Sequence, residues 1–161
     1  MEPKEILIEW LKNAYAMEQQ IVQTLEAHAK DFDSMPEMQE MIEQHIEETK
    51  DQADRVKMEV ERLGDEVSSV KSGLAEAMGM MTGMGSDLFK DKIVKNAIAE
   101  HATEHLEMAT YEAIATAAEI ADEPATRELA MDLVKEETRT GEKLKTMLPQ
   151  VVRKYFENRA E

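Results

Sequence analysis

The sequence predicts a single all-α domain folded as a four-helix bundle. The composition is rich in Ala, Glu, Met, Lys and Leu, which favour helices, and only 4% of the residues are aromatic, which leaves little to favour strands. Apolar residues recur every three or four positions along four long stretches, as on the buried face of an amphipathic helix. The 161 residues suffice to bury the core of one domain, which we expect to span residues 1–161.

The first helix is expected over residues 4–30. Its seam residues are spaced alternately four and three apart: Leu7, Leu11, Ala14, Glu18, Ile21, Leu25 and His28. A turn at residues 31–36 follows, and the second helix is expected over residues 35–63, with Ser34 as its N-cap and Pro36 in its first turn. The inner stripe of this helix is more polar around its middle: Met38, Met41, His45, Glu48, Gln52, Val56, Glu59 and Leu63.

The segment after Gly64 differs in character, and we expect it to be a crossover connection. It contains a predicted short helix over residues 67–78, followed by a methionine-rich run broken by glycines, residues 78–84. Flexible apolar packing, mainly as a contact with a second copy of the chain, is the expected role of that run. Binding of Cu(I) by its thioethers is the alternative.

The second half of the chain is predicted to form the other two long helices. The third is expected over residues 87–121, with Ser86 as its N-cap. The fourth is expected over residues 125–147, because Pro149 should interrupt it. A short last helix, residues 150–159, should pack against the bundle or against a partner.

Four glutamates lie at matched depth in these helices. Glu18 and Glu48 are thirty residues apart around the first turn, and Glu107 and Glu137 are thirty apart around the second. In each antiparallel hairpin the glutamates should therefore lie about 23 Å from the turn. Two such hairpins joined by a crossover have the topology of ferritin-like bundles. Because unpaired buried carboxylates are costly, a bound cation is the expected explanation, and a layer of mutually satisfied polar side chains is the alternative.

The third helix adds another candidate ligand. Glu104 and Glu107 are three residues apart and share one face of that helix. Di-iron and di-manganese bundles use one Glu from each of two helices and Glu-x-x-His from each of the other two. Here Asp51 and Thr140 stand where those histidines would be. Glu104 could therefore serve as an extra carboxylate.

Each of three further polar residues has two possible roles. His45, one turn before Glu48, and His105 are either nitrogen ligands or inward hydrogen-bonding residues. Tyr111, one turn beyond Glu107, is expected to pack in the core with its hydroxyl bonded to a carboxylate, and a redox or proton-transfer role is the alternative.

The charge and the composition exclude several classes of function. Asp and Glu outnumber Lys and Arg by 35 to 19, and the resulting charge of −16 repels nucleic acid and anionic lipid. No apolar run approaches the roughly 18 residues that a membrane span requires, and no signal peptide begins the sequence. We therefore expect neither nucleic acid nor membrane as a partner, and a cytoplasmic location.

Four segments occur together in the order and with the gaps of a known family: AMEQQ at 16–20, HIEET at 45–49, EHLEMATY at 104–111 and EETRTGEKL at 136–144. Over about residues 5–148 the chain resembles the YciF-like bacterial stress proteins, a ferritin-like family related to the rubrerythrins. The resemblance implies a ferritin-like bundle, frequent homodimerisation and a dinuclear metal site. Carried over residue by residue, it implies these metal ligands: Glu18, Glu48, Glu104, Glu107 and Glu137.

The expected function follows from ligand type and resemblance together. A carboxylate-rich centre suits iron, most plausibly as a di-iron pair, and also accepts manganese or zinc. Oxidation of Fe(II) by dioxygen or peroxide is the expected chemistry if the protein is an enzyme. The alternatives are a non-enzymatic helical stress or interaction module and manganese-dependent peroxide dismutation.

Overall fold

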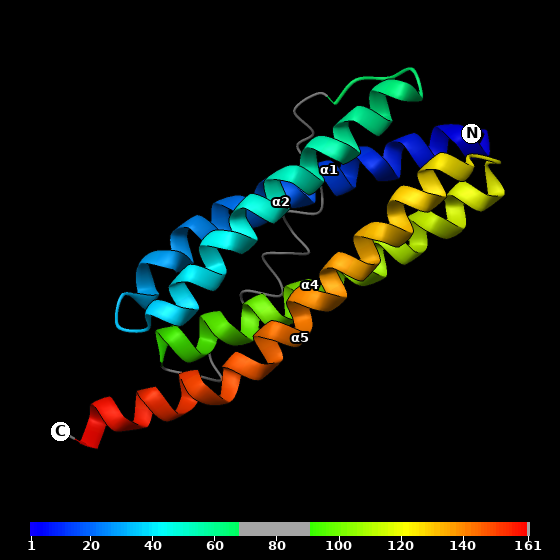
Figure 1. The fold of residues 1–161 in the computed structure, drawn as a ribbon. Coiled ribbons are helices and arrows are strands. Elements are labelled where there is room, and N and C mark those ends of the chain that lie inside the picture. The colour runs from blue at the N-terminus through cyan, green and yellow to red at the C-terminus, as the bar shows by residue number, and fades with distance from the viewer. Residues whose placement is uncertain (68–90, 161) are drawn as a thin grey trace.

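The computed structural model describes residues 1–67 and 91–160, which contain four long helices and no strand. The elements are α1 (Pro3–Ala29), a 3₁₀ turn η1 (Lys30–Phe32), α2 (Pro36–Arg62), α4 (Lys92–Ile120) and α5 (Pro124–Ala160). The predicted all-α bundle is thereby confirmed (Figure 1). The predicted short helix at 67–78 and the methionine-rich run at 78–84 fall largely or wholly outside the described residues.

The bundle consists of two antiparallel hairpins, α1 with α2 and α4 with α5, packed against each other (Figure 1). The first turn lies beside the start of α4, because Asp31 pairs with Lys92 Nζ at 2.6 Å and accepts a hydrogen bond from Asn96 Nδ2 at 2.8 Å. At the other end, Arg62 at the end of α2 pairs with Glu123 at 2.8 Å, just before α5 begins. Helices α2 and α4 therefore run in the same direction. Their connection joins opposite ends of the bundle, as a crossover requires.

Two helix starts differ from the predicted ones. The N-cap of α2 is Met35 instead of Ser34, because the carbonyl of Met35 accepts the first helical hydrogen bonds and Pro36 fixes the first helical residue. The predicted cap at Ser86 lies outside the described residues. Helix α4 begins at Lys92, and the carboxylate of its N-cap, Asp91, accepts a hydrogen bond from the backbone N–H of Val94 at 3.0 Å.

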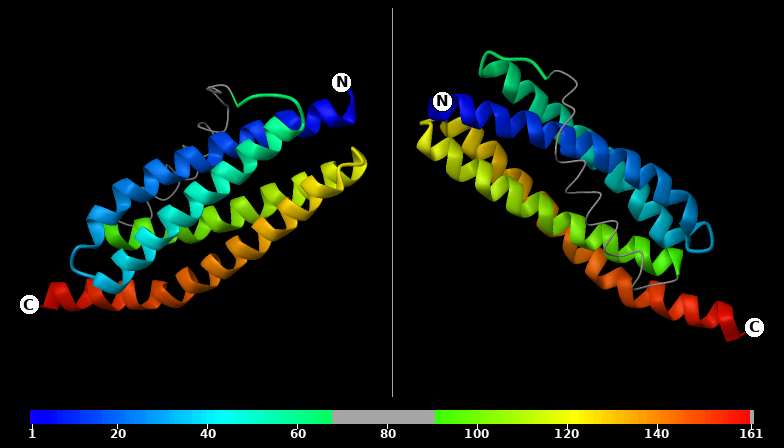
Figure 2. Two further views of the ribbon diagram at one scale, coloured as in Figure 1. Left: turned by 45° about the horizontal axis from the view of Figure 1, so that its top comes forward. Right: turned by 180° about the vertical axis from the view of Figure 1, so that it is seen from behind.

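The predicted break at Pro149 is also wrong, because α5 continues through it to Ala160. Pro149 is exposed, while Leu144 before it and Val151 after it are buried in the core. Packing on both sides thus outweighs the one hydrogen bond that proline removes. Figure 2 shows α5 bending toward its C-terminal end, as a proline inside a helix causes, and this end projects beyond the other helices.

Layers of apolar side chains lie on both sides of a group of polar side chains at mid-height of the bundle. On α1, Leu7 and Leu11 lie to one side of Glu18, and Ile21 and Leu25 lie to the other, and all five side chains are at most 1% exposed. The same order recurs on α5, where Leu133 precedes Glu137 and Leu144 follows it. The polar side chains at mid-height are therefore shielded from water at both ends of the bundle. None of the described helices has the length and apolar character needed to cross a membrane.

Candidate metal centre

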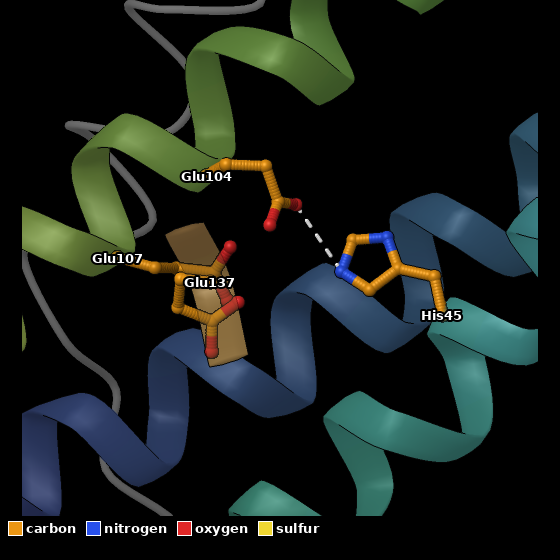
Figure 3. A group of neighbouring side chains, drawn as sticks. All are labelled: His45, Glu104, Glu107 and Glu137. Atoms are coloured by element: carbon orange, nitrogen blue, oxygen red, sulfur yellow. Dashed lines mark ion pairs between the residues drawn. The ribbon is translucent and has the colours of Figure 1, made fainter. Parts of the chain in front are cut away.

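Four glutamates from three helices meet in the middle of the bundle. Glu18 comes from α1, Glu104 and Glu107 come from α4, and Glu137 comes from α5, and each is 0% exposed. His45 from α2 joins them. One possible ligand atom from each of His45, Glu104, Glu107 and Glu137 lies within 4.8 Å of the others, and Figure 3 shows their side chains pointing toward one another. This group could hold a metal ion.

The helical spacing explains how one helix supplies two of these carboxylates. Glu104 and Glu107 are three residues apart, so their side chains project from the same face of α4, the face that continues with buried Tyr111 and Ile114. The sequence therefore predicted correctly that Glu104 turns inward.

His45 lies inside the cluster as a neutral imidazole. It is 4% exposed, and its Nε2 atom lies 3.2 Å from Oε1 of Glu104. Burial, helped by the positive charge of Lys143, lowers the pKa of His45 to about 4. A neutral imidazole at pH 7 has a lone pair that can bind a metal. Of the two candidate histidines, the structure thus brings His45 to the cluster and leaves His105 outside it, exposed on α4.

The carboxylates of the cluster have almost no hydrogen-bond partners. Both oxygens of Glu104, Glu107 and Glu137, and Oε2 of Glu18, are buried without a partner among the described residues. The exception is Oε1 of Glu18, which accepts a hydrogen bond from the hydroxyl of buried Tyr111. Tyr111 therefore packs in the core with its hydroxyl on a carboxylate, as predicted. Buried carboxylates in this state are stable only if they are protonated or bound to a cation.

Burial also raises the pKa of each of these four carboxyl groups. The pKa of Glu18 rises to about 7 even though the hydrogen bond from Tyr111 opposes the effect. The pKa of Glu137 rises to about 8 through burial and the charge of Glu18, and that of Glu104 rises to about 10 through burial and the charge of Glu137. The pKa of Glu107 lies well above its ordinary value for the same kinds of reason. A bound cation would offset both effects on the pKa by supplying positive charge.

The structure does not bring Glu48 into this cluster. Its side chain is exposed, and its Oε2 accepts a hydrogen bond from Thr140 Oγ1 at 3.3 Å. The buried face of α2 includes His45, Thr49, Gln52 and Val56, and at 3.6 residues per turn Glu48 lies about a quarter turn from the centre of that face. The candidate ligand of α2 that points inward is thus His45, three residues before Glu48.

Glu48 instead lines a surface pocket of about 410 Å³ between α2 and α5. The other lining residues are Glu47, Asp51, Arg55, Glu136 and Arg139. In this pocket Arg55 binds Glu136 through two nitrogens, and buried Gln52 donates a hydrogen bond to Glu136 at 3.1 Å. Burial raises the pKa of Glu18, and the positive charge of Arg55 opposes this rise. Sequence reasoning did not single out Arg55, because no periodic pattern marks it.

A family model described as a domain of unknown function, DUF892, matches residues 2–157 of the chain. Among solved structures, a protein from Xanthomonas campestris pv. campestris is 28% identical, with a TM-score of 0.84 over 99% of this chain and 100% of that chain. The Escherichia coli stress protein YciF is 22% identical, with a TM-score of 0.81 over 96% of this chain and 99% of that one.

A protein from Rhodopseudomonas palustris, YcfI, is likewise 22% identical, with a TM-score of 0.79 over 91% of this chain and 94% of that one. These similarities extend over nearly the full length of the described bundle. The predicted resemblance to YciF-like proteins is therefore confirmed.

Proposed function

Because the chain belongs to the DUF892 family, whose domain has no assigned function, we propose a function from its own buried cluster: it binds divalent metal ions, as a pair of irons, in a carboxylate-rich centre. The observation that carries this proposal is the set of buried carboxylate oxygens that have no hydrogen-bond partner among the described residues. Unpaired buried charges are among the most costly features of a core, and metal binding is the usual reason for keeping them.

The residues present fit two hard or borderline cations. Glu18, Glu104, Glu107 and Glu137 carry four negative charges when ionised, which balance two divalent cations. His45 supplies a nitrogen donor, which suits iron and zinc better than calcium or magnesium. All five residues lie in helices, so their positions are fixed by the packed bundle. Manganese and zinc stay as alternative occupants.

Iron bound in such a centre supplies one-electron chemistry with dioxygen or peroxide as the oxidant. The protein residues have separate roles in it. The four glutamates would neutralise and orient the cations, and Tyr111 fixes the position of Glu18 through its hydrogen bond. The apolar layers above and below keep bulk water away from the cluster. By analogy with YciF, which is described as a stress protein, we place this chemistry in iron handling or stress protection.

Metal loading under anaerobic conditions tests the proposal. The wild-type protein should bind up to two equivalents of Fe(II) or Mn(II), and the melting temperature should rise with metal and fall with chelator. The double variant Glu107→Gln plus Glu137→Gln keeps the shape of both side chains but removes two charges, so it should lose most of this binding. A matched control is Glu112→Gln plus Glu119→Gln, which changes two exposed glutamates of α4. Equal metal binding by all three proteins would contradict the proposal.

One observation favours a second candidate function. The raised pKa values of Glu104 and Glu137 allow these groups to stay protonated near pH 7 without any metal. The cluster would then be a neutral polar layer that sets the register of the helices in a non-enzymatic stress or interaction module. Such a protein should show the same melting temperature with Fe(II), with Mn(II) and with chelator.

A further inference from the structure

A pair of histidines lies on α4 outside the buried cluster. His101 and His105 are four residues apart, so they are neighbours on the helix surface. Their ring centroids are 4.9 Å apart, with the ring planes at 83°. His105 is exposed and His101 is partly exposed, so solvent can reach this pair.

The hydrogen bonding of His105 leaves one ring nitrogen ready for a ligand. Its Nδ1 lies 3.0 Å from the backbone carbonyl of His101. Because a carbonyl oxygen only accepts, Nδ1 must carry the proton, and Nε2 of the neutral ring then holds a lone pair. Histidines that bind metals commonly show this arrangement, in which a backbone carbonyl fixes the tautomer of the ring.

The ring of His101 lies against α5. It lies close to the backbone of Gly141, and its Nδ1 is shielded from solvent. A ligand that arrives from solvent therefore meets Nε2 of His101, and it also meets Nε2 of His105.

This pair is separate from the buried cluster although Glu104 lies between its members in sequence. Glu104 is 0% exposed and faces His45 across the bundle, whereas His105 faces solvent. Two histidines four residues apart on one helix hold zinc in metallopeptidase motifs, where a glutamate of the same motif acts as general base. Here the glutamate points inward, so the pair has ligands for a metal but no base for hydrolysis.

We propose that His101 and His105 form a second, solvent-accessible site that binds a borderline divalent transition metal such as Zn²⁺, Ni²⁺ or Cu²⁺. Imidazole nitrogens suit these ions, and the affinity should be highest for Cu²⁺. Water would complete the coordination. The net charge of −16 attracts cations to the surface and favours occupancy. This site takes its metal from solvent and does not depend on the proposed function of the buried cluster.

Nuclear magnetic resonance of the four histidine side chains tests the proposal on the wild-type protein. Zn²⁺ should shift the imidazole signals of His101 and His105 together, before it shifts that of His28. Cu²⁺ should broaden the same two signals before that of His28. If His28 responds first, or if the pair does not respond after all other signals have stopped changing, the proposal is wrong.

Two substitutions make the test quantitative. His105→Gln alters an exposed side chain and should weaken Zn²⁺ binding at the pair by about tenfold to 100-fold, because it removes one arm of a chelate. Glu112→Gln, an exposed position on the same helix, is the control, and it should leave binding at the pair unchanged. Equal loss in both variants would overturn the proposal.

A third variant distinguishes the two sites. Glu107→Gln plus Glu137→Gln should abolish metal binding in the buried cluster and leave the Zn²⁺ response of His101 and His105 intact. If the double variant also abolishes the response of the pair, the pair is not an independent site.

Discussion

Nε2 of His45 lies 3.2 Å from Oε1 of Glu104, and the two residues belong to α2 and α4, the helices that run in the same direction in different hairpins. Both side chains are almost completely buried. Their contact therefore joins the two hairpins at mid-height of the bundle. Any cation bound between them would connect the hairpins, so we expect occupancy of the cluster to stabilise the whole domain.

Glu48 should not be required for metal binding. Its side chain is exposed and bonded to Thr140, away from the buried group. We expect Glu48→Ala to keep the metal stoichiometry and the metal-induced rise in melting temperature of the wild type, whereas Glu137→Ala should lose both. Equilibrium dialysis and thermal melts with Mn(II) measure these effects. A loss of one equivalent in Glu48→Ala would show that its side chain turns inward when metal binds, as the sequence predicted.

The metal-free protein should become less stable as the pH rises above neutrality. The folded-state pKa values of Glu18 and Glu137, about 7 and about 8, lie above the ordinary value of 4.5. The folded state thus retains protons that the unfolded chain has released, and this contribution to stability, complete below pH 4.5, is lost as the pH passes through these values. His45 acts in the opposite sense, but only below its ordinary pKa of 6.5.

Thermal melts in chelator at pH 6.5 and pH 9.5 measure this dependence. We expect a fall of at least about 3 °C, the change that roughly 1 kcal/mol produces in a domain of this size. Glu137→Gln should show a smaller fall, because it lacks one of the titrating groups. A melting temperature that is constant between the two pH values would contradict the assignment of raised pKa values to the cluster.

The sequence predicted the helices and most of the cluster because both follow from spacing along single helices. The seam of α1 placed Glu18 between apolar neighbours, and the i, i+3 relation placed Glu104 and Glu107 on one face. For α2 the spacing was ambiguous, since His45 and Glu48 both lie in a stripe that is polar at its middle. Only the packing of α2 against the other helices decides that His45 points inward.

The end of α5 was not predictable for a related reason. Proline inside a helix costs about 3 kcal/mol relative to alanine, so Pro149 predicted the end of the helix. Burial of Val151 depends on the other helices, and local sequence rules do not include its contribution to helix stability.

Homodimerisation, predicted from the resemblance, stays a prediction.

Tyr111→Phe should destabilise the protein without changing its fold. The substitution removes the donor to Oε1 of Glu18 and leaves that buried oxygen without a partner. The loss should be about 1–3 kcal/mol, measured as a shift of the urea unfolding midpoint in chelator. Tyr15→Phe is the control, because the hydroxyl of Tyr15 makes no hydrogen bond within residues 1–67 and 91–160. Equal effects of the two substitutions would show that the bond to Glu18 contributes nothing.

Glu59→Ala should weaken the end of the bundle where α2 meets the start of α5. Buried Glu59 accepts hydrogen bonds from Arg62, at 2.8 Å and 3.0 Å, and from Thr126. We expect a loss of about 1–3 kcal/mol near pH 7. Metal binding should be unchanged, because this network lies away from the cluster. The control is Glu61→Ala, an exposed position on the same helix.

The effect of Glu59→Ala should also depend on pH. Burial raises the pKa of Glu59, but the bonds from Arg62 and Thr126 outweigh that effect, and the pKa lies below its ordinary value of 4.5. The stabilisation is therefore present above pH 4.5 and is lost as the pH falls through the folded-state pKa. In urea unfolding, the difference in free energy of unfolding between Glu59→Ala and the wild type should be large at pH 7 and small at pH 3.

Gly141 gives a way to displace Glu104 without removing its charge. A Cβ atom at Gly141 would lie 3.5 Å from Cβ of Glu104 and 3.9 Å from Cε of Met108, which are ordinary contacts. Gly141→Ala should thus fit, and it should stabilise α5 by about 0.5–1 kcal/mol, because glycine costs that much in a helix interior. Gly141→Leu has no room and must push Glu104 or Met108 aside. We expect it to lower Mn(II) binding while Gly141→Ala keeps it. Wild-type binding by Gly141→Leu would contradict the expected displacement of Glu104.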